Sequence, residues 1–226
     1  MSDSPPVALP PMPPAIKRLP EDKHHRPVPW FVARDEAGVP DHRVASFSAL
    51  VDAIRFGKCW ICGQPLGRWA TFPIGPMCAI SRITAEPPSH RECASYAVRA
   101  CPFLRTPEMQ RRERNLPADK LDPAGTMIMR NPGVTALWTT RDWTVLRQPR
   151  GALFRLGDAA EVEWVRRGRA ATRAEVLDSI ESGMPLLLAD AQENGPAAVA
   201  DLERGRESVA SLLPPEPCPT SRPLPR

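Results

Sequence analysis

Five of the six cysteines lie between residues 59 and 101, and this segment holds two pairs of ligand-type residues with the same spacing. Two residues separate Cys59 from Cys62, two separate His90 from Cys93, and 27 residues lie between the pairs. Two thiolates at this spacing on a tight turn can both reach one zinc ion at about 2.3 Å. Three thiolates and one imidazole complete a tetrahedron without an open position. The sequence therefore predicts a structural site with zinc as its cofactor.

Two further cysteines leave alternatives to this ligand set. Cys78 follows Met77 in an apolar stretch and could replace His90 as a ligand. Cys101 lies eight residues after Cys93. That is about 80° round a helix at 100° per residue, so Cys101 could face the same core. The other interpretation is that Cys78 and Cys101 are small buried thiols, as free cysteines often are.

The first pair needs a tight turn, and a connecting segment must bring the two pairs together. Gly63 directly follows Cys62, and glycine permits the positive φ that such a turn usually requires. Residues 69–74 lie between the pairs. We expect this segment to supply a hairpin.

The second pair stands where a helix is predicted to begin. Pro87–Pro88 disfavours helix upstream, and Ser89 with Glu92 has the pattern of a capping box. His90 and Cys93 then occupy the first and fourth helical positions. Residues three apart share one face of a helix, with their Cβ atoms about 5–6 Å apart, so both side chains can reach one metal ion.

A cysteine knuckle, a hairpin and a ligand pair in the first turn of a helix resemble the treble-clef class of zinc fingers over residues 57–101. The resemblance implies that Cys59 and Cys62 match the knuckle ligands and that His90 and Cys93 match the helix ligands. Treble clefs usually carry cysteine where His90 stands. The class includes nucleic-acid-binding, protein-docking and nuclease members, so it implies a fold and a metal but not one function. The runs 75–78, 87–90 and 101–104 are also similar to bacterial and prophage proteins of unknown activity.

The remainder of the sequence predicts an α+β protein with short antiparallel strands followed by C-terminal helices. Fifteen of the 29 prolines lie in the two ends of the chain, which are poor in large apolar residues and are expected to be disordered. We expect a disordered tail at 1–29, a hairpin and zinc unit at 30–115, a linker at 116–132, an α+β unit at 133–213 and a second tail at 214–226.

Individual elements follow from local signals such as turn residues, caps and apolar periodicity. Trp138, Trp143 and Trp164 are expected to pack inside a small β meander. Thr172 and Glu175 form a capping box, and Gly183 is expected to end the helix that it starts. Strands are predicted at 30–34, 42–45, 134–140, 143–147, 152–156 and 161–165, and helices at 46–56, 108–115, 172–183, 185–193 and 196–213.

The net charge of +4 does not require a polyanionic partner, but the basic residues are concentrated near the cysteines. Residues 50–115 hold ten Lys or Arg against five acidic residues. This concentration favours a nucleic-acid-binding module with DNA or RNA as partner, whose affinity would fall steeply with salt. The candidate phosphate-binding residues are Arg91, Arg99, Arg111, Arg112 and Arg114.

A protein-docking adaptor is the competing hypothesis, with the C-terminal helices or the proline-rich tails as its contact surface. The direction of the arginines separates the two hypotheses. A single basic face favours nucleic acid, whereas arginines that are dispersed or paired with Glu92, Glu108 and Glu113 favour the adaptor.

An HNH-type nuclease is a further alternative that the sequence supports less well. Its metal site needs a histidine base and additional His or Asn ligands. If His90 binds zinc, His42 is the one histidine left in the segment expected to fold, and the asparagines lie far from it in sequence. Nucleotide-binding glycine loops and hydrolase or metalloprotease motifs are not present. The sequence therefore favours a binding protein over an enzyme without deciding between them, and we name no catalytic residue.

The N-terminal sequence and the longest apolar run indicate the compartment. Met1–Pro20 has no continuous apolar stretch after a basic start, so we expect no signal peptide. Met184–Ala189 is far shorter than the roughly twenty residues that span a bilayer. Metal-bound thiolates fit a reducing compartment. We expect a cytoplasmic protein without a membrane partner.

Overall fold

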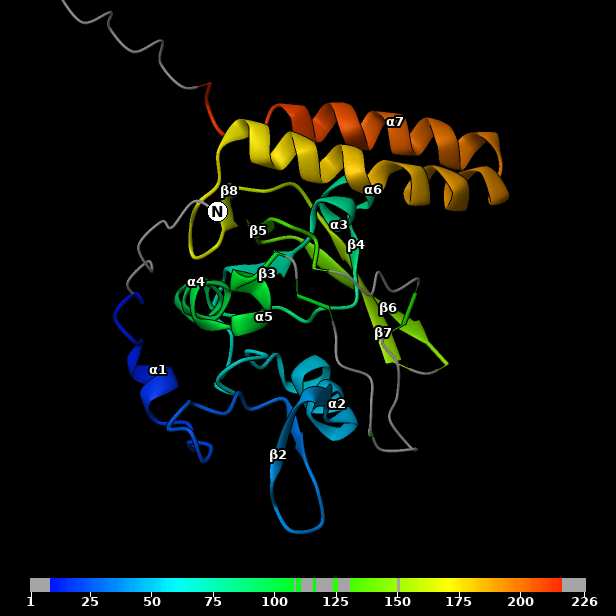
Figure 1. The fold of residues 1–226 in the computed structure, drawn as a ribbon. Coiled ribbons are helices and arrows are strands. Elements are labelled where there is room, and N and C mark those ends of the chain that lie inside the picture. The colour runs from blue at the N-terminus through cyan, green and yellow to red at the C-terminus, as the bar shows by residue number, and fades with distance from the viewer. Residues whose placement is uncertain are drawn as a thin grey trace, which may run out of the picture.

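The computed structural model describes residues 9–107, 109–110, 116, 124–125, 131–149 and 151–216. Its helices and antiparallel strands form an α+β fold with two C-terminal helices (Figure 1). The elements are α1 (Pro14–Lys17), β1 (Val32–Arg34), β2 (Pro40–Ala45), α2 (Phe47–Phe56), β3 (Ala70–Ile74), α3 (Pro76–Ser81), β4 (Ile83–Thr84), α4 (Arg91–Ala100), α5 (Pro102–Arg105), β5 (Thr135–Thr140), β6 (Trp143–Gln148), β7 (Gly151–Leu156), β8 (Glu161–Arg166), β9 (Arg169–Ala170), α6 (Arg173–Glu193) and α7 (Pro196–Ala210).

Strand pairing joins the two halves that the sequence divides at residues 116–132. One sheet has the order β3-β5-β8-β9 and another has the order β4-β7-β6. In each sheet the strand that precedes the expected linker pairs with strands that follow it, as in the register of Phe72 with Trp138. The division into two separate units at this point therefore does not describe the fold.

The predicted strands between residues 134 and 166 are present, but they do not form a single meander. β6 pairs with β7, whereas β5 pairs with β3 and β8. Every residue of β5 is buried, so both faces of the sheet are covered at this central strand. Trp138 and Trp164 are buried in the main core with Phe72 and Phe154, and Trp143 is partly buried against it.

Arg82 connects the core to the last helix. Its guanidinium carbon lies 4.3 Å from the centre of the Trp138 ring, which is a cation–π geometry. The same guanidinium donates to the carbonyl of Gly157 at 3.0 Å and to the Ser208 hydroxyl at 2.8 Å. One side chain thus holds the β3-β5-β8-β9 sheet and α7 together.

The helix that begins at Arg173 does not end at Gly183, as the sequence suggests, but continues to Glu193. Gly183 is buried against α3, where an added Cβ would lie 2.8 Å from the sulfur of Met77. The glycine therefore permits close helix packing rather than a helix end. Figure 1 shows α6 and α7 lying side by side above α3.

Gly205 of α7 also permits close helix packing against α3, and we expect Gly205→Ala to destabilise the protein. In an exposed helix this change would stabilise by about 1 kcal/mol. Here the new Cβ would lie 2.2 Å from the carbonyl oxygen of Ile80, so α7 must move away from α3. Overpacking of this kind costs about 1–3 kcal/mol, measurable by chemical denaturation. Gly67→Ala is the control, because a Cβ there has no neighbour within 4 Å; equal effects would contradict the assignment.

The capping box at the start of α6 is confirmed. The Thr172 hydroxyl accepts from the Glu175 backbone N–H at 3.3 Å, and the Glu175 carboxylate accepts from the Thr172 N–H at 2.9 Å. Glu175 also accepts two hydrogen bonds from Arg169, at 2.6 and 2.9 Å. These Arg169 bonds, more than the backbone bond, lower the pKa of Glu175 to about 2.

This low pKa predicts how stability depends on pH. The contribution of the Glu175 carboxylate is complete above its unfolded pKa of about 4.3 and is lost as the pH falls toward 2. We expect Glu175→Gln to cost about 1 kcal/mol at pH 7, as loss of a helix cap does. The difference in unfolding free energy between the two proteins should shrink from pH 5 to pH 3. A difference that is constant over this range would contradict the assignment.

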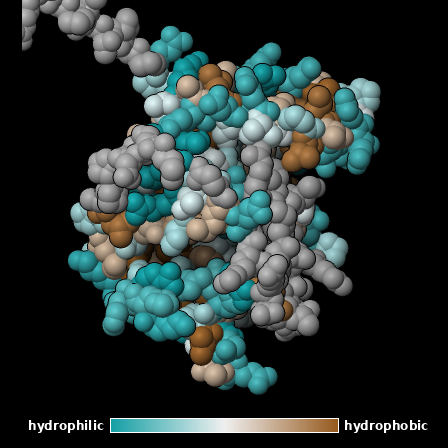
Figure 2. Space-filling model, viewed as in Figure 1, coloured by the Kyte–Doolittle hydropathy of each residue, from teal (hydrophilic) through white to brown (hydrophobic). Residues whose placement is uncertain are grey.

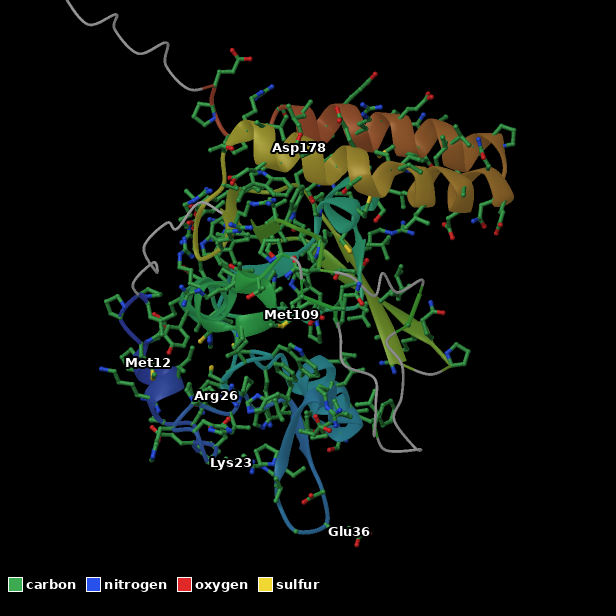
Figure 3. All side chains as sticks on the ribbon, viewed as in Figure 1. Met12, Lys23, Arg26, Glu36, Met109 and Asp178 are labelled. Atoms are coloured by element: carbon green, nitrogen blue, oxygen red, sulfur yellow. The ribbon has the colours of Figure 1, made fainter. Side chains whose placement is uncertain are left out.

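The N-terminal region differs most from expectation. The sequence predicts disorder over residues 1–29, but residues 9–29 contain the helix α1 and two buried apolar side chains. Ile16 is 2% exposed and Val28 is 1% exposed. Figure 3 shows Met12 beside α1, with Lys23 and Arg26 on the segment that follows. These buried side chains attach the segment to the rest of the protein. Residues 1–8 and 217–226, and most of the helix predicted at 108–115, lie outside the described residues.

The predicted elements that precede the cysteine segment are confirmed. β1 and β2 form an antiparallel pair around residues 35–39. Ser46 caps α2 by accepting from the Ala49 N–H, and Gly57 ends the helix in the left-handed region with φ +57°. α2 therefore leads directly into Cys59.

Candidate metal centre

The structure brings the two predicted ligand pairs together. The ligand atoms of Cys59, Cys62, His90 and Cys93 all lie within 4.8 Å of one another. This is a group that could hold a metal ion. Across the part of the chain that the structure describes, no other set of three or more His, Cys, Asp or Glu side chains has this property.

The first pair lies on a tight turn. The Gly63 N–H donates to the carbonyl of Cys59 at 2.8 Å, and the Cys59 N–H donates to the carbonyl of Gln64 at 2.7 Å. Gly63 has φ +71°, as the sequence predicts, and an added Cβ would also lie 2.7 Å from the Trp30 ring. Glycine is therefore required here both by the backbone conformation and by the contact with Trp30.

The second pair lies at the start of α4, one position later than expected. His90 is the N-cap and the helix begins at Arg91, so Cys93 is the third helical residue. The predicted capping box is absent because Ser89 exchanges two backbone hydrogen bonds with Thr71, each 2.9 Å long. The Ser89 hydroxyl is buried without a hydrogen-bond partner instead of capping the helix.

The expected hairpin between the pairs is also absent. Residues 70–74 form one strand, β3, which pairs with β5 from the other half of the chain, and α3 follows it. Two connections replace the hairpin: the bridge between Thr71 and Ser89, and the hydrogen bond from the Trp60 N–H to the Pro88 carbonyl at 3.0 Å. The knuckle is thus attached to the backbone that immediately precedes the ligand helix.

The His90 ring is oriented by a hydrogen bond outside the ligand group. Its Nε2 lies 3.0 Å from the carbonyl oxygen of Pro65, which can only accept, so Nε2 carries the proton. Nδ1 then presents its lone pair to the thiols, 3.4 Å from Cys62 Sγ and 3.9 Å from Cys93 Sγ. A histidine ligand usually has such a carbonyl partner on its other nitrogen.

The three thiols perturb one another because they are close and largely buried. Hydrogen bonds from Cys62 and Cys93 hold the pKa of Cys59 below its usual range, and the backbone N–H of His90 also donates to Cys59 Sγ at 3.3 Å. The hydrogen bonds with Cys59 and Cys62, and the charge of these two groups, raise the pKa of Cys93. A cation at the centre would remove this conflict by stabilising all three thiolates together.

Apolar side chains surround the ligand group. Cys59, Cys62 and Cys93 belong to a buried cluster that includes Ile61 and, from the N-terminal segment, Ile16. Met12, Ala15 and Leu19 are partly buried against the same cluster. The segment expected to be a disordered tail therefore covers one side of the candidate metal centre.

Neither of the other two cysteines in the segment joins the group. Cys78, the alternative ligand, lies on α3 against the main core, and burial raises the pKa of its thiol to about 11. Cys101 is the C-cap of α4 and is partly buried. Both fit the interpretation as structural thiols.

The two described arginines of the expected nucleic-acid surface form ion pairs. Arg91 donates to Glu161, at 2.9 Å through Nε, and also approaches Glu163. Arg99 pairs with Glu163 and donates to the Ser95 hydroxyl at 2.7 Å. The two glutamates lie on β8, far from the arginines in sequence. Arg111, Arg112 and Arg114 lie outside the described residues.

His42, the histidine considered for a nuclease site, lies away from the metal ligands on β2. Its Nε2 is 3.3 Å from a carboxylate oxygen of Asp22, which is itself bonded to Arg26 at 2.9 Å. Hydrogen bonds from Arg26 hold the pKa of Asp22 well below its usual range. This cluster attaches the N-terminal segment to β2.

Two further findings concern membrane-spanning helices and similarity to known proteins. Among the described residues, none of the helices has both the length and the apolar character needed to cross a bilayer. No family model matches the sequence, and neither the curated proteins nor the solved structures give a match.

Proposed function

We propose that the protein is a protein-docking module stabilised by one structural zinc ion. The convergence of Cys59, Cys62, His90 and Cys93 within 4.8 Å supports this proposal most directly. Three sulfurs and one imidazole nitrogen are a typical ligand set of structural zinc, and they use all four tetrahedral positions. No position remains for a water or substrate, so the ion stabilises the fold rather than performing chemistry.

The arrangement is similar to a treble clef in two of its three parts. A cysteine knuckle is followed, after an intervening strand, by a ligand in the first turn of a helix. The third part, the hairpin, is replaced by β3 and its bridge from Thr71 to Ser89. We propose a treble-clef-like unit in which the β3-β5-β8-β9 sheet takes the place of the hairpin.

The charges near the site favour protein docking over nucleic-acid binding. Arg91 and Arg99 are already paired with Glu161 and Glu163, so a phosphate backbone would have to displace these carboxylates to bind the two arginines. Large apolar side chains are exposed elsewhere, for example Leu186 at 58%. Figure 2 shows brown apolar areas among the polar surface on the α6–α7 side of the molecule. Exposed apolar areas with a polar border are typical of protein-interaction surfaces.

Cobalt substitution and an oligonucleotide titration test the two parts of this proposal. Cobalt(II) in place of zinc should give the intense visible absorption of a tetrahedral thiolate site, and His90→Ala should alter it. Labelled single- and double-stranded oligonucleotides should show no salt-dependent binding to the metal-loaded protein. Binding that weakens steeply with salt, or cleavage of DNA in the presence of magnesium, would contradict the docking function.

A further inference from the structure

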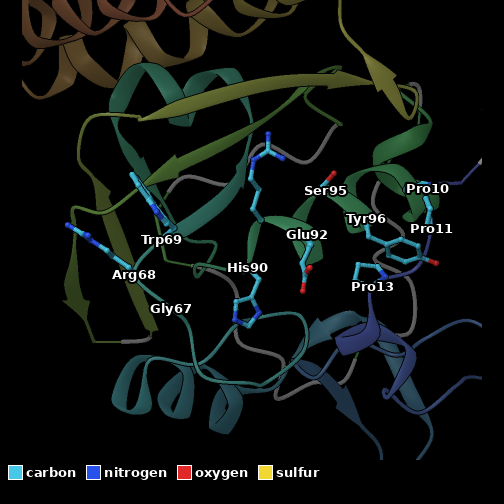
Figure 4. A pocket seen from close by; sticks show the side chains of 11 residues that line it. Pro10, Pro11, Pro13, Gly67, Arg68, Trp69, His90, Glu92, Ser95 and Tyr96 are labelled. Atoms are coloured by element: carbon cyan, nitrogen blue, oxygen red, sulfur yellow. The ribbon is translucent and has the colours of Figure 1, made fainter.

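A groove runs past the candidate metal centre on the side of α4. It has a volume of about 660 Å³ (Figure 4). Trp69 lies at one end and Tyr96 at the other, and the first turn of α4, with His90 and Glu92, lines it between them. We refer to it as the Trp69–Tyr96 groove. The metal ligand His90 is therefore part of its wall, and the groove depends on the fold that the metal would stabilise.

The Tyr96 end already holds a proline-rich segment of this chain. Pro10, Pro11 and Pro13 line the groove beside Tyr96. Pro13 has φ −60° and ψ 147°, which are polyproline II values. The Tyr96 ring is 8% exposed and is held in the cluster around Ile16. This end of the groove thus accommodates three prolines, of which Pro13 has the polyproline II conformation.

The Trp69 end presents a second, fixed aromatic ring. Trp69 is 39% exposed and directly precedes β3, while Arg141 directly follows β5, the strand paired with it. The Arg141 guanidinium carbon lies 3.8 Å from the centre of the Trp69 ring. This cation–π contact fixes the ring orientation before any ligand arrives, which reduces the entropic cost of binding.

The groove carries charges of both signs, with Arg68 lining it beside Trp69 and Glu92 on the first turn of α4, so a cationic ligand group would lie at the α4 part of the groove. Arg91 is paired with Glu161, whereas Glu92, on the same turn of α4, is exposed and forms no ion pair with another described residue. A nucleic acid would place phosphates near this carboxylate. A peptide carrying an arginine would instead gain an ion pair with Glu92.

We propose that the Trp69–Tyr96 groove binds a proline-rich segment of a partner protein, in the polyproline II conformation, with an arginine beside Glu92. Grooves lined by aromatic rings recognise such segments because the ligand is already extended and loses little entropy on binding. Prolines of the partner stack on Trp69, at the end of the groove opposite Pro10 and Pro11. The proposal rests on the docking function and names the class of partner.

Peptide binding to the full, metal-loaded chain tests this proposal. The probes are a synthetic decapeptide of prolines with one central arginine, an all-proline decapeptide, and a glycine–arginine decapeptide of equal length. We expect measurable binding of both proline peptides, with the arginine peptide tighter, and none of the glycine peptide. Trp69→Ala should weaken binding at least about tenfold, as loss of a central aromatic contact does.

Glu92→Gln provides the sharper variant because it tests the charge alone. It should reduce the affinity for the arginine peptide to that for the all-proline peptide, so that the variant no longer distinguishes the two peptides. Phe47→Ala, at an exposed aromatic of α2 outside the groove, should have no effect. Absence of proline-peptide binding, equal affinity in Trp69→Ala, or preference for an oligonucleotide would overturn the proposal.

The metal content of the same samples separates this proposal from the proposed function. Protein that holds zinc but does not bind the proline peptides would overturn the groove assignment and leave the structural zinc site intact. Protein without metal would overturn the structural zinc site whatever the peptides do.

Discussion

Replacing Cys62 with serine is expected to abolish zinc binding and to unfold the region around the knuckle and α4. The serine hydroxyl is a much poorer zinc ligand than a thiolate. Structural zinc supplies about 10–16 kcal/mol of apparent binding free energy in small zinc units, and this energy is available only to the folded state. The buried cluster around the ligands includes Ile61 and Tyr96, which would then be exposed. Circular dichroism and metal analysis of the purified variant measure both losses.

Cys78→Ser is the matched control, since it makes the same chemical change in the same segment. Cys78 lies on α3 against the main core and outside the ligand group, so the variant should keep its full zinc content. Its stability should fall only by the cost of a small polar substitution in a partly buried position. If Cys78→Ser lost the metal and Cys62→Ser retained it, the ligand assignment would be wrong.

The second large effect is expected from Ile16→Asp in the N-terminal segment. Ile16 is 2% exposed and packs in the cluster that contains three of the proposed ligands. A carboxylate cannot remain there without a partner, so the segment should detach from the metal centre. A chelator would then reach the site through local opening rather than through global unfolding. We expect zinc extraction from the folded protein to accelerate at least about tenfold, which corresponds to 1.4 kcal/mol in the opening free energy.

Leu9→Asp is the control for this experiment because it introduces the same charge in the same segment at a side chain that is 52% exposed. Its rate of zinc extraction should match that of the unmodified protein. Equal rates for all three proteins would show that residues 9–28 do not protect the metal centre. Ile16→Ala, which leaves a cavity without a buried charge, should give an intermediate rate.

Local signals in the sequence predict much of the site correctly, because they depend on neighbouring residues. The positive φ of Gly63 and the capping box of Thr172 and Glu175 each need only a few adjacent side chains. The strands after residue 134 are predicted from turns and alternation in the same way. The spacing of the ligand pairs belongs to this class of signal as well.

The incorrect predictions concern contacts between residues that are distant in the sequence. Residues 70–74 have the composition of a strand, but nothing local shows that the partner is β5 rather than a neighbouring strand. Ser89 has the sequence of a cap, and the bridge to Thr71 prevents it from acting as one. Gly183 has the local sequence of a helix end, but it is required for the close contact of α6 with Met77 on α3, which is distant in sequence.

The charge-based prediction of a nucleic-acid surface stays a prediction, and it too depends on contacts between distant residues. Arginines are concentrated near the cysteines, but Arg91 is paired with Glu161, 70 residues away, and Arg99 with Glu163, 64 residues away. A charge count along the sequence does not include such pairing. The proline content of residues 9–29 suggested disorder, but apolar residues of this segment, among them Ile16 and Val28, are buried against parts of the chain that are distant in sequence.

The zinc content of the unmodified full chain tests the central claim most directly. Native mass spectrometry of protein purified without added metal should show one zinc ion per chain, and alkylation before unfolding should not modify Cys59, Cys62 or Cys93. The ion should be lost in His90→Ala and retained in Cys78→Ser. A metal-free protein whose cysteines all react with the alkylating agent would contradict the account, because the four converging side chains would then hold no structural ion.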